Sequence, residues 1–231
     1  MAKIASIIVA ALIPLVVLAF WPLYLSRPFA AVDWYTHLHA VAGSLWLALL
    51  IAQPAAIHTR RFALHRVLGR ISYLLATLFA VSAVLLSHHR LASMNDASFV
   101  TDGFAHYLPF YATVVFLLAY GLGLWFRRKP AVHGRFMLCT AIPVVDPVLG
   151  RVLAFYLPPL PSPWLYQVVT FSIATAIAGM LVFTYRGSAS ARHALLGYFV
   201  VLVLLEIGWF VFSPTAAWLE AVRWFRGLAL I

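Results

Sequence analysis

Long apolar runs separated by short polar segments dominate the pattern of this chain. Several of these runs exceed the length of about 20 mainly apolar residues that a helix needs to cross a bilayer. Prolines, glycines and pairs of basic residues, such as Arg60-Arg61, mark the connections between them. The pattern predicts an all-α polytopic membrane protein, one bundle over residues 1–231, with seven transmembrane helices over residues 4–25, 34–57, 65–87, 104–126, 133–157, 163–185 and 193–212.

The pattern changes after the seventh run. Ser213-Pro214 is typical of a helix N-cap followed by proline at the first helical position. A short amphipathic helix is therefore expected in the tail, residues 213–231, lying on the membrane surface. Its apolar face would carry Trp218, Leu219, Val222 and Phe225, and its polar face Glu220, Arg223 and Arg226.

Composition and charge agree with a membrane protein. The chain is 65% hydrophobic and only 10% charged, which excludes a soluble domain. The net charge of +10 therefore indicates topology and contact with the lipid bilayer, and no nucleic-acid partner. A bacterial inner membrane is the expected location, as a multi-pass protein of the cell membrane.

The distribution of charges predicts an orientation with the N-terminus inside and the C-terminus outside. Four acids fall on the predicted outer side, namely Asp33, Asp96, Asp102 and Glu220. Most basic residues fall on the inner side: Lys3, Arg60, Arg61, Arg66, Arg70, Arg127, Arg128, Lys129, Arg135, Arg186 and Arg192. Aromatic residues at the outer edge, including Tyr107, Tyr111 and Trp209, predict an interfacial belt.

Histidines stand at or near the starts of four successive predicted helices. Consecutive membrane helices are antiparallel, so these histidines alternate between the two faces. A bis-histidine haem b needs two imidazoles at equal depth on facing helices. The pairs that match in depth are His39 with His106 on the outer side and His65 with His133 on the inner side. His37 is about 200° from His39 around its helix, so only one of them points inward, and the deeper His39 is preferred.

This alternation, over residues 34–157, resembles the two-haem transmembrane cytochromes of the b-561 type. In that family the second and fourth helices hold one haem, and the third and fifth hold the other. The resemblance implies a four-helix unit with one or two haem b groups, electron transfer across or within the membrane, and a quinone or small-molecule reductant as partner. Arg70, Arg135 and Arg151 are expected to balance the propionates.

Two short motifs give a second resemblance. The segments His65-Arg66-Val67-Leu68-Gly69-Arg70 and His133-Gly134-Arg135-Phe136-Met137 are similar to motifs of an uncharacterised bacterial multi-pass membrane family. That family has a His-Arg-x-x-Gly-Arg segment and, two helices later, a His-x-x-x-Met segment. The resemblance implies no activity.

Charged residues at mid-membrane are a further signal. Asp146 and Glu206 lie deep in the fifth and seventh predicted helices, and Arg151 is about 7.5 Å further along the axis from Asp146. Charges in hydrocarbon are costly, so these residues indicate a proton path, a binding site or a propionate clamp, or else an ion pair that ties the two helices together. Pro147 is expected to kink its helix.

Four functions fit these residues. The first is a haem-b membrane oxidoreductase that moves electrons, with Asp146 and Glu206 handling protons. The second is a non-haem enzyme that holds copper, iron or zinc. Its ligands would be the outer histidines His37, His39, His88, His89 and His106. The third is a transporter that uses Asp146, Arg151 and Glu206. The fourth is a subunit of a larger membrane complex.

Overall fold

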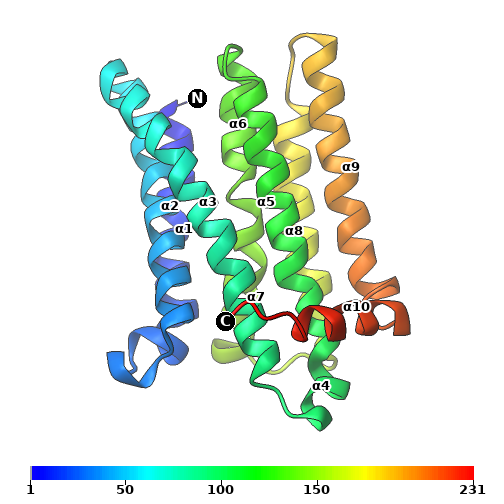
Figure 1. Cartoon of the computed structure of the whole chain (residues 1–231). Coiled ribbons are helices and arrows are strands. Elements are labelled where there is room, and N and C mark those ends of the chain that lie inside the picture. Colours follow the sequence, from blue (N-terminus) through cyan, green and yellow to red (C-terminus); the bar gives the residue numbers. More distant parts are fainter. Residues whose placement is uncertain (1) are drawn as a thin grey trace.

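The computed structural model describes residues 2–231, and it describes all their side chains except those of residues 2–5, 8 and 163. The side chain of Lys3, one of the residues used to orient the chain, thus lies outside the described part. Within residues 2–231 every regular element is a helix (Figure 1), so the all-α prediction is confirmed.

Six helices or helix pairs of the described residues are long and apolar enough to cross a membrane. They are α2 (Trp34–His58), α3 (Phe62–Ala92), α4 (Asp96–Asp102) continued through η3 (Gly103–His106) into α5 (Tyr107–Trp125), α6 (Pro130–Cys139) continued into α7 (Ile142–Tyr156), α8 (Pro163–Phe183) and α9 (Ala189–Val211). The chain begins with α1 (Ala2–Phe20) and η1 (Trp21–Leu25), of which the stretch Val9–Leu25 forms a shorter apolar helix.

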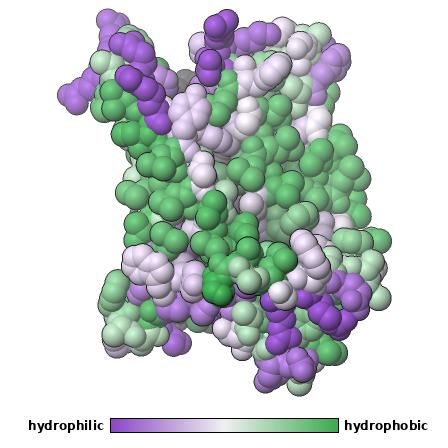
Figure 2. Space-filling view, in the orientation of Figure 1, coloured by the Kyte–Doolittle hydropathy of each residue, from purple (hydrophilic) through white to green (hydrophobic). Residues whose placement is uncertain are grey.

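The two ends of the bundle differ in character. We call one the basic end, formed by the turns after α2, α5 and α8, and the other the tail end, formed by η2 (Phe29–Ala31), α4 and α10 (Ala216–Arg226). Figure 2 shows hydrophilic residues at both ends and a hydrophobic belt between them. Large apolar side chains stay exposed in this belt, for example Leu74 at 74% and Leu204 at 60%. Apolar surface of this extent needs a lipid partner, which supports a multi-pass membrane protein.

The fifth predicted span divides into α6 and α7 at two turn residues, Thr140 and Ala141. Their backbone stays in the right-handed helical region, and Pro143 stands at the start of α7. Pro147 lies inside α7, so the interruption falls before the proline that was expected to cause a kink. Pro143 lacks the amide hydrogen that would continue the α6 hydrogen bonds, which makes this position the natural restart of the helix.

One helix at the tail end was not predicted, and one predicted helix cap there is corrected. The connection after α3 contains a helix, α4, because the Asn95 side chain accepts a hydrogen bond from the Ser98 amide at 2.8 Å. The amphipathic helix α10 is present, but Thr215 caps it, with its hydroxyl accepting from the Trp218 amide. Ser213 was expected to be the cap, and its hydroxyl instead donates to the Trp209 carbonyl at 2.6 Å.

The tail is fastened to the rest of the bundle by side-chain to backbone hydrogen bonds. The Trp218 indole donates to the Phe104 carbonyl at 3.3 Å, and the Arg226 guanidinium donates to the Met94 carbonyl at 2.6 Å. His88 on α3 donates to the Leu228 carbonyl at 2.8 Å. These bonds hold α10 across the ends of α3 and α5.

Candidate functional site

A buried carboxyl group lies just after the break between α6 and α7. Asp146 is in the first half of α7, and its side chain is 7% exposed. Its Oδ1 atom accepts hydrogen bonds from Gln167 Nε2 at 2.9 Å and from Thr170 Oγ1 at 2.6 Å, both on α8. Neutral donors of one neighbouring helix therefore hold this carboxyl.

A second buried carboxyl belongs to the same region. Glu206 on α9 is 6% exposed; its Oε1 accepts from the Tyr111 hydroxyl at 3.2 Å and its Oε2 accepts from the Thr175 hydroxyl. Asp146 and Glu206 are close enough to act electrostatically on each other and on Tyr111. We call this group the buried acid site; its members are Asp146, Gln167, Thr170, Tyr111, Glu206 and Thr175.

Arg151 does not neutralise this site by a direct ion pair. Its Nη1 atom donates to the Pro147 carbonyl at 2.8 Å, its guanidinium lies 4.8 Å from the centre of the Phe20 ring, and its Nε atom is buried without a partner. The ion pairs of the described residues lie elsewhere, at the tail end: His89 and Arg90 with Asp33, Arg223 with Glu220, and Arg226 with Asp96. The expected ion pair between the fifth and seventh helices is therefore not formed.

Neither carboxyl group has an ion-pair partner among the described residues, although Arg151 is near enough to Asp146 to act on it electrostatically. A carboxylate in apolar surroundings is costly unless a positive charge accompanies it. Thr170, Thr175, Tyr111 and Gln167 supply hydrogen bonds but no charge. Both carboxyl groups are thus sites where taking up a proton or a small cation removes that cost.

The surroundings of the site differ toward the two ends of the bundle. Toward the basic end the core is closed by Phe136, Leu195 and Tyr198, each at most 1% exposed. Toward the tail end Trp209, one turn from Glu206, contacts Phe104 and Trp164 with ring centres 5.4 and 5.8 Å away. Those two rings line a cavity of about 210 Å³, together with Val100, Pro214 and Leu219.

The outer histidine pair is held by serines of α3. His39 Nδ1 lies 3.1 Å from Ser82 Oγ, and this hydroxyl donates its hydrogen to the Phe79 carbonyl at 2.8 Å. His39 Nδ1 must therefore be the donor, which leaves its Nε2 atom with a free lone pair. His106 Nδ1 lies 3.0 Å from Ser87 Oγ. The two serines are five residues apart, about 7.5 Å along the helix.

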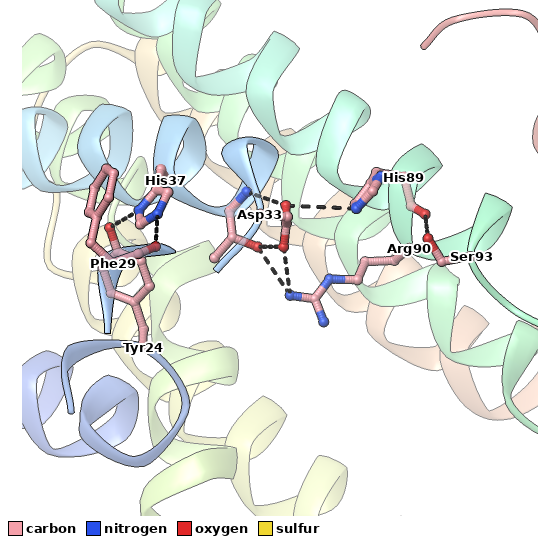
Figure 3. A network of polar contacts seen from close by, with 8 residues as sticks. Tyr24, Phe29, Asp33, His37, His89, Arg90 and Ser93 are labelled. Carbon is pink, nitrogen blue, oxygen red and sulfur yellow. Dashed lines mark hydrogen bonds and ion pairs between the residues drawn. The ribbon is translucent and has the colours of Figure 1, made fainter. Parts of the chain in front are cut away.

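The other outer histidines have different partners. In Figure 3 the His37 ring lies against Phe29 and Tyr24, whereas His89 points to Asp33. Both nitrogens of His37 are occupied, Nδ1 by the Tyr24 hydroxyl at 2.9 Å and Nε2 by the Phe29 carbonyl at 3.0 Å. His88 is directed at the tail.

No group of three or more His, Cys, Asp or Glu residues in the described part of the chain could hold a metal ion. The expectation that His37, His39, His88, His89 and His106 gather around copper, iron or zinc is therefore not met. The bundle separates these side chains: they turn toward the loop after α1, toward α3, toward Asp33 and toward the tail.

The two inner histidines have different hydrogen-bond partners. The Gln53 amide is oriented by the backbone of α3, with its oxygen accepting from the Gly69 amide at 2.8 Å and its nitrogen donating to the His65 carbonyl at 3.3 Å. The same nitrogen donates to His65 Nδ1, so the proton of the neutral ring is on Nε2. His133 Nδ1 donates to the Gly123 carbonyl at 2.8 Å. Only His133 therefore presents a free Nε2 lone pair.

Arg70 and Arg135, which were expected to pair with haem propionates, lie in different surroundings. Arg135 donates to the Leu181 carbonyl at 3.0 Å and to the Ala131 carbonyl at 3.1 Å, and its guanidinium lies over the Tyr185 ring. Arg70 is exposed at the basic end. Arg135 is thus directed to backbone carbonyls of α6 and α8.

The partners of the carboxyl groups were not anticipated from the sequence. Tyr111, Tyr107 and Trp209 were expected in an interfacial belt, but they are 1%, 3% and 6% exposed and lie inside the bundle. The available signal was the presence of Gln167, Thr170 and Thr175 in a mostly apolar helix. No family model, no curated protein and no solved structure matches the chain.

Proposed function

We propose that this chain is a membrane transporter that couples its cycle to a proton or a small cation at the buried acid site. The observation that carries the proposal is the pair of buried carboxyls, Asp146 and Glu206, held only by neutral hydrogen-bond donors. Groups of this kind inside a membrane bundle typically belong to ion or proton pathways.

The interrupted span supports the same function. Transporters commonly place their binding sites where a membrane helix is discontinuous, because the freed backbone and the helix end face the ligand. Asp146 lies in the first half of α7, about one turn after the interruption at Thr140 and Ala141.

The test is proton flux into proteoliposomes that contain a pH-sensitive dye, driven by a potassium diffusion potential. We expect Asp146→Asn and Glu206→Gln each to abolish protein-dependent flux. Asp102→Asn makes the same chemical change at an exposed position and should retain it. His106→Ala and His133→Ala should retain it as well. Full flux in both buried variants contradicts the proposal.

The proposal includes seven spans, with α1 and η1 as the first and the N-terminus in the cytoplasm. The support is the arginine-rich character of the basic end, since cytoplasmic loops are enriched in Lys and Arg. In a Cys139→Ser background, an impermeant maleimide should label Asp102→Cys in intact cells and Arg128→Cys only after lysis. The reverse labelling contradicts the orientation.

A second candidate is electron transfer through one haem b at the tail end, held by His39 and His106. The observation that favours it is the hydrogen bond from His39 to Ser82, which leaves Nε2 available to iron. When bound, haem would supply one-electron redox chemistry. Oxidised and reduced absorption spectra after haem-replete expression test it: His39→Ala should remove the Soret band and His65→Ala should keep it. A colourless wild-type protein eliminates this candidate.

A further inference from the structure

A surface groove at the basic end has a charge that nothing in the chain balances. Its volume is about 460 Å³, and its lining consists of Gly121, Leu124, Trp125, Arg127 and Arg128. The groove starts on the last turns of α5 and ends at the turn toward α6. Its lining therefore combines apolar helix residues with two arginines.

The arginines lack an acidic partner. Of the six acids in the chain, Asp33, Asp96, Asp102 and Glu220 are at the tail end, and Asp146 and Glu206 are buried. The polar contact that the structure gives Arg127 is a long one, from Nη1 to the Tyr73 hydroxyl at 3.5 Å. The guanidinium groups of two consecutive arginines offer donors that suit the oxygens of a phosphate group.

The apolar half of the groove has the shape for a hydrocarbon chain. Gly121 has no atom within 4 Å of the position of a Cβ, so the helix surface is open there. Leu117, one turn away, and Leu124, one turn to the other side, share this face. Leu117 is 47% exposed, and Trp125, at the polar rim, is 81% exposed. Tryptophan prefers this level of a bilayer, between headgroups and chains.

We infer that this groove binds one anionic phospholipid, with its phosphate at Arg127 and Arg128 and an acyl chain along Gly121. Charge complementarity selects this occupant over a neutral lipid. The C-terminal end of α5 carries about half a negative charge and opposes an anion. Two full positive charges outweigh it, and one would leave a weaker net attraction, so both arginines contribute.

The experiment measures lipid binding to the full chain, delipidated in neutral detergent, by native mass spectrometry. Phosphatidylglycerol and phosphatidylcholine with the same acyl chains are titrated in parallel, and inorganic phosphate is the lipid-free probe. We expect phosphatidylglycerol to bind more tightly than phosphatidylcholine. Arg127→Gln with Arg128→Gln should weaken its binding by about 30-fold, because each basic side chain contributes separately.

The matched control is Arg60→Gln with Arg61→Gln, the other arginine pair at the basic end. This variant removes the same amount of charge outside the groove. Because salt screens distant charges, it should weaken phosphatidylglycerol binding by about threefold or less. Gly121→Leu fills the apolar half and should weaken phosphatidylglycerol but leave inorganic phosphate unchanged. Equal binding of the two lipids, equal losses in the two arginine pairs, or phosphate binding as tight as the lipid would each overturn the inference.

Discussion

The hydroxyl of Tyr111 on α5 donates to the carboxyl of Glu206 on α9 across 3.2 Å, at a place where both side chains are almost fully buried. The contact joins helices whose residues are 95 positions apart in sequence. It also completes the set of neutral donors around the two carboxyls. Tyr111, predicted at the membrane surface, therefore supplies one of the two hydrogen bonds that hold Glu206.

Removing this hydroxyl should weaken the bundle modestly. Tyr111→Phe leaves Glu206 with Thr175 as its donor, and we expect a loss of about 0.5–1.5 kcal/mol in the free energy of unfolding, the usual range for a hydrogen bond between membrane helices. Unfolding by a denaturing detergent measures it. Tyr35→Phe is the matched control, since the Tyr35 contact is ring stacking on His89. A larger loss in the control contradicts this explanation.

A close approach of α5 to α9 depends on Gly208. Tyr107 reaches over this glycine to donate to the Leu205 carbonyl at 2.9 Å, and a Cβ at position 208 would collide with the Tyr107 hydroxyl. Gly208→Ala should therefore destabilise the fold by about 1–3 kcal/mol. Gly197→Ala on the same helix meets nothing within 4 Å and should be neutral or stabilising. Thermal unfolding in detergent compares the two; equal midpoints contradict the collision.

Asp33 makes the tail end sensitive to acid. It caps α2 through the Thr36 amide and lies 3.9 Å from both His89 and Arg90 of α3 (Figure 3). Partial burial raises the pKa of Asp33, but two hydrogen bonds from Thr36 and the charges of Arg90 and His89 outweigh it, so the pKa lies below the ordinary value. The ionised form is thus favoured by folding.

The lowered pKa of Asp33 determines how the stability of the fold changes with pH. Asp33 should stabilise the fold above the ordinary aspartate pKa of about 4 and lose this contribution as the pH falls through its lower folded value. Asp33→Asn keeps a capping side chain and removes the charge, so it should cost about 1 kcal/mol or less at neutral pH and nothing in strong acid. Unfolding curves as a function of pH test it. A difference that grows toward acid pH has the wrong sign.

The attachment of α10 depends on one of its two tryptophans. Trp218 is 9% exposed and contacts Tyr107 and Phe110, whereas Trp224 on the same helix is 69% exposed. Trp218→Ala should remove about 3–5 kcal/mol of packing and release the tail, because large buried aromatics leave large cavities. Hydrogen exchange of residues 213–231 should rise. Trp224→Ala is the control; equal exchange in the two variants contradicts this role.

Local patterns were sufficient for the long helices of this protein. The apolar runs predicted an all-helical membrane protein, and the alternation of apolar and charged positions predicted α10. Capping choices were harder, because Ser213 and Thr215 are both good caps and the backbone position decides between them. The break at Thr140 was also hidden, since α6 and α7 together have the hydropathy of one span.

At the candidate site, too, the sequence predicted some features and could not predict others. Sequence depth identified Asp146 and Glu206 as buried acids, because charge is rare and costly in hydrocarbon. It could not assign their partners, since Tyr111, Thr170 and Thr175 come from other helices, and the rotation of each helix about its axis decides which side chains meet. The same rotations turned His37, His88 and His89 away from one another.

The sequence by itself determined the class of this protein: an apolar chain of this length must satisfy its backbone within helices and face lipid. It also determined which residues are too polar to face lipid. Only the tertiary structure decided that Asp146 and Glu206 are held by neutral donors, and that His65 and His133 present unlike nitrogens. Helix formation depends on neighbours in sequence, whereas hydrogen bonds between helices depend on packing, and packing is set by the whole bundle at once.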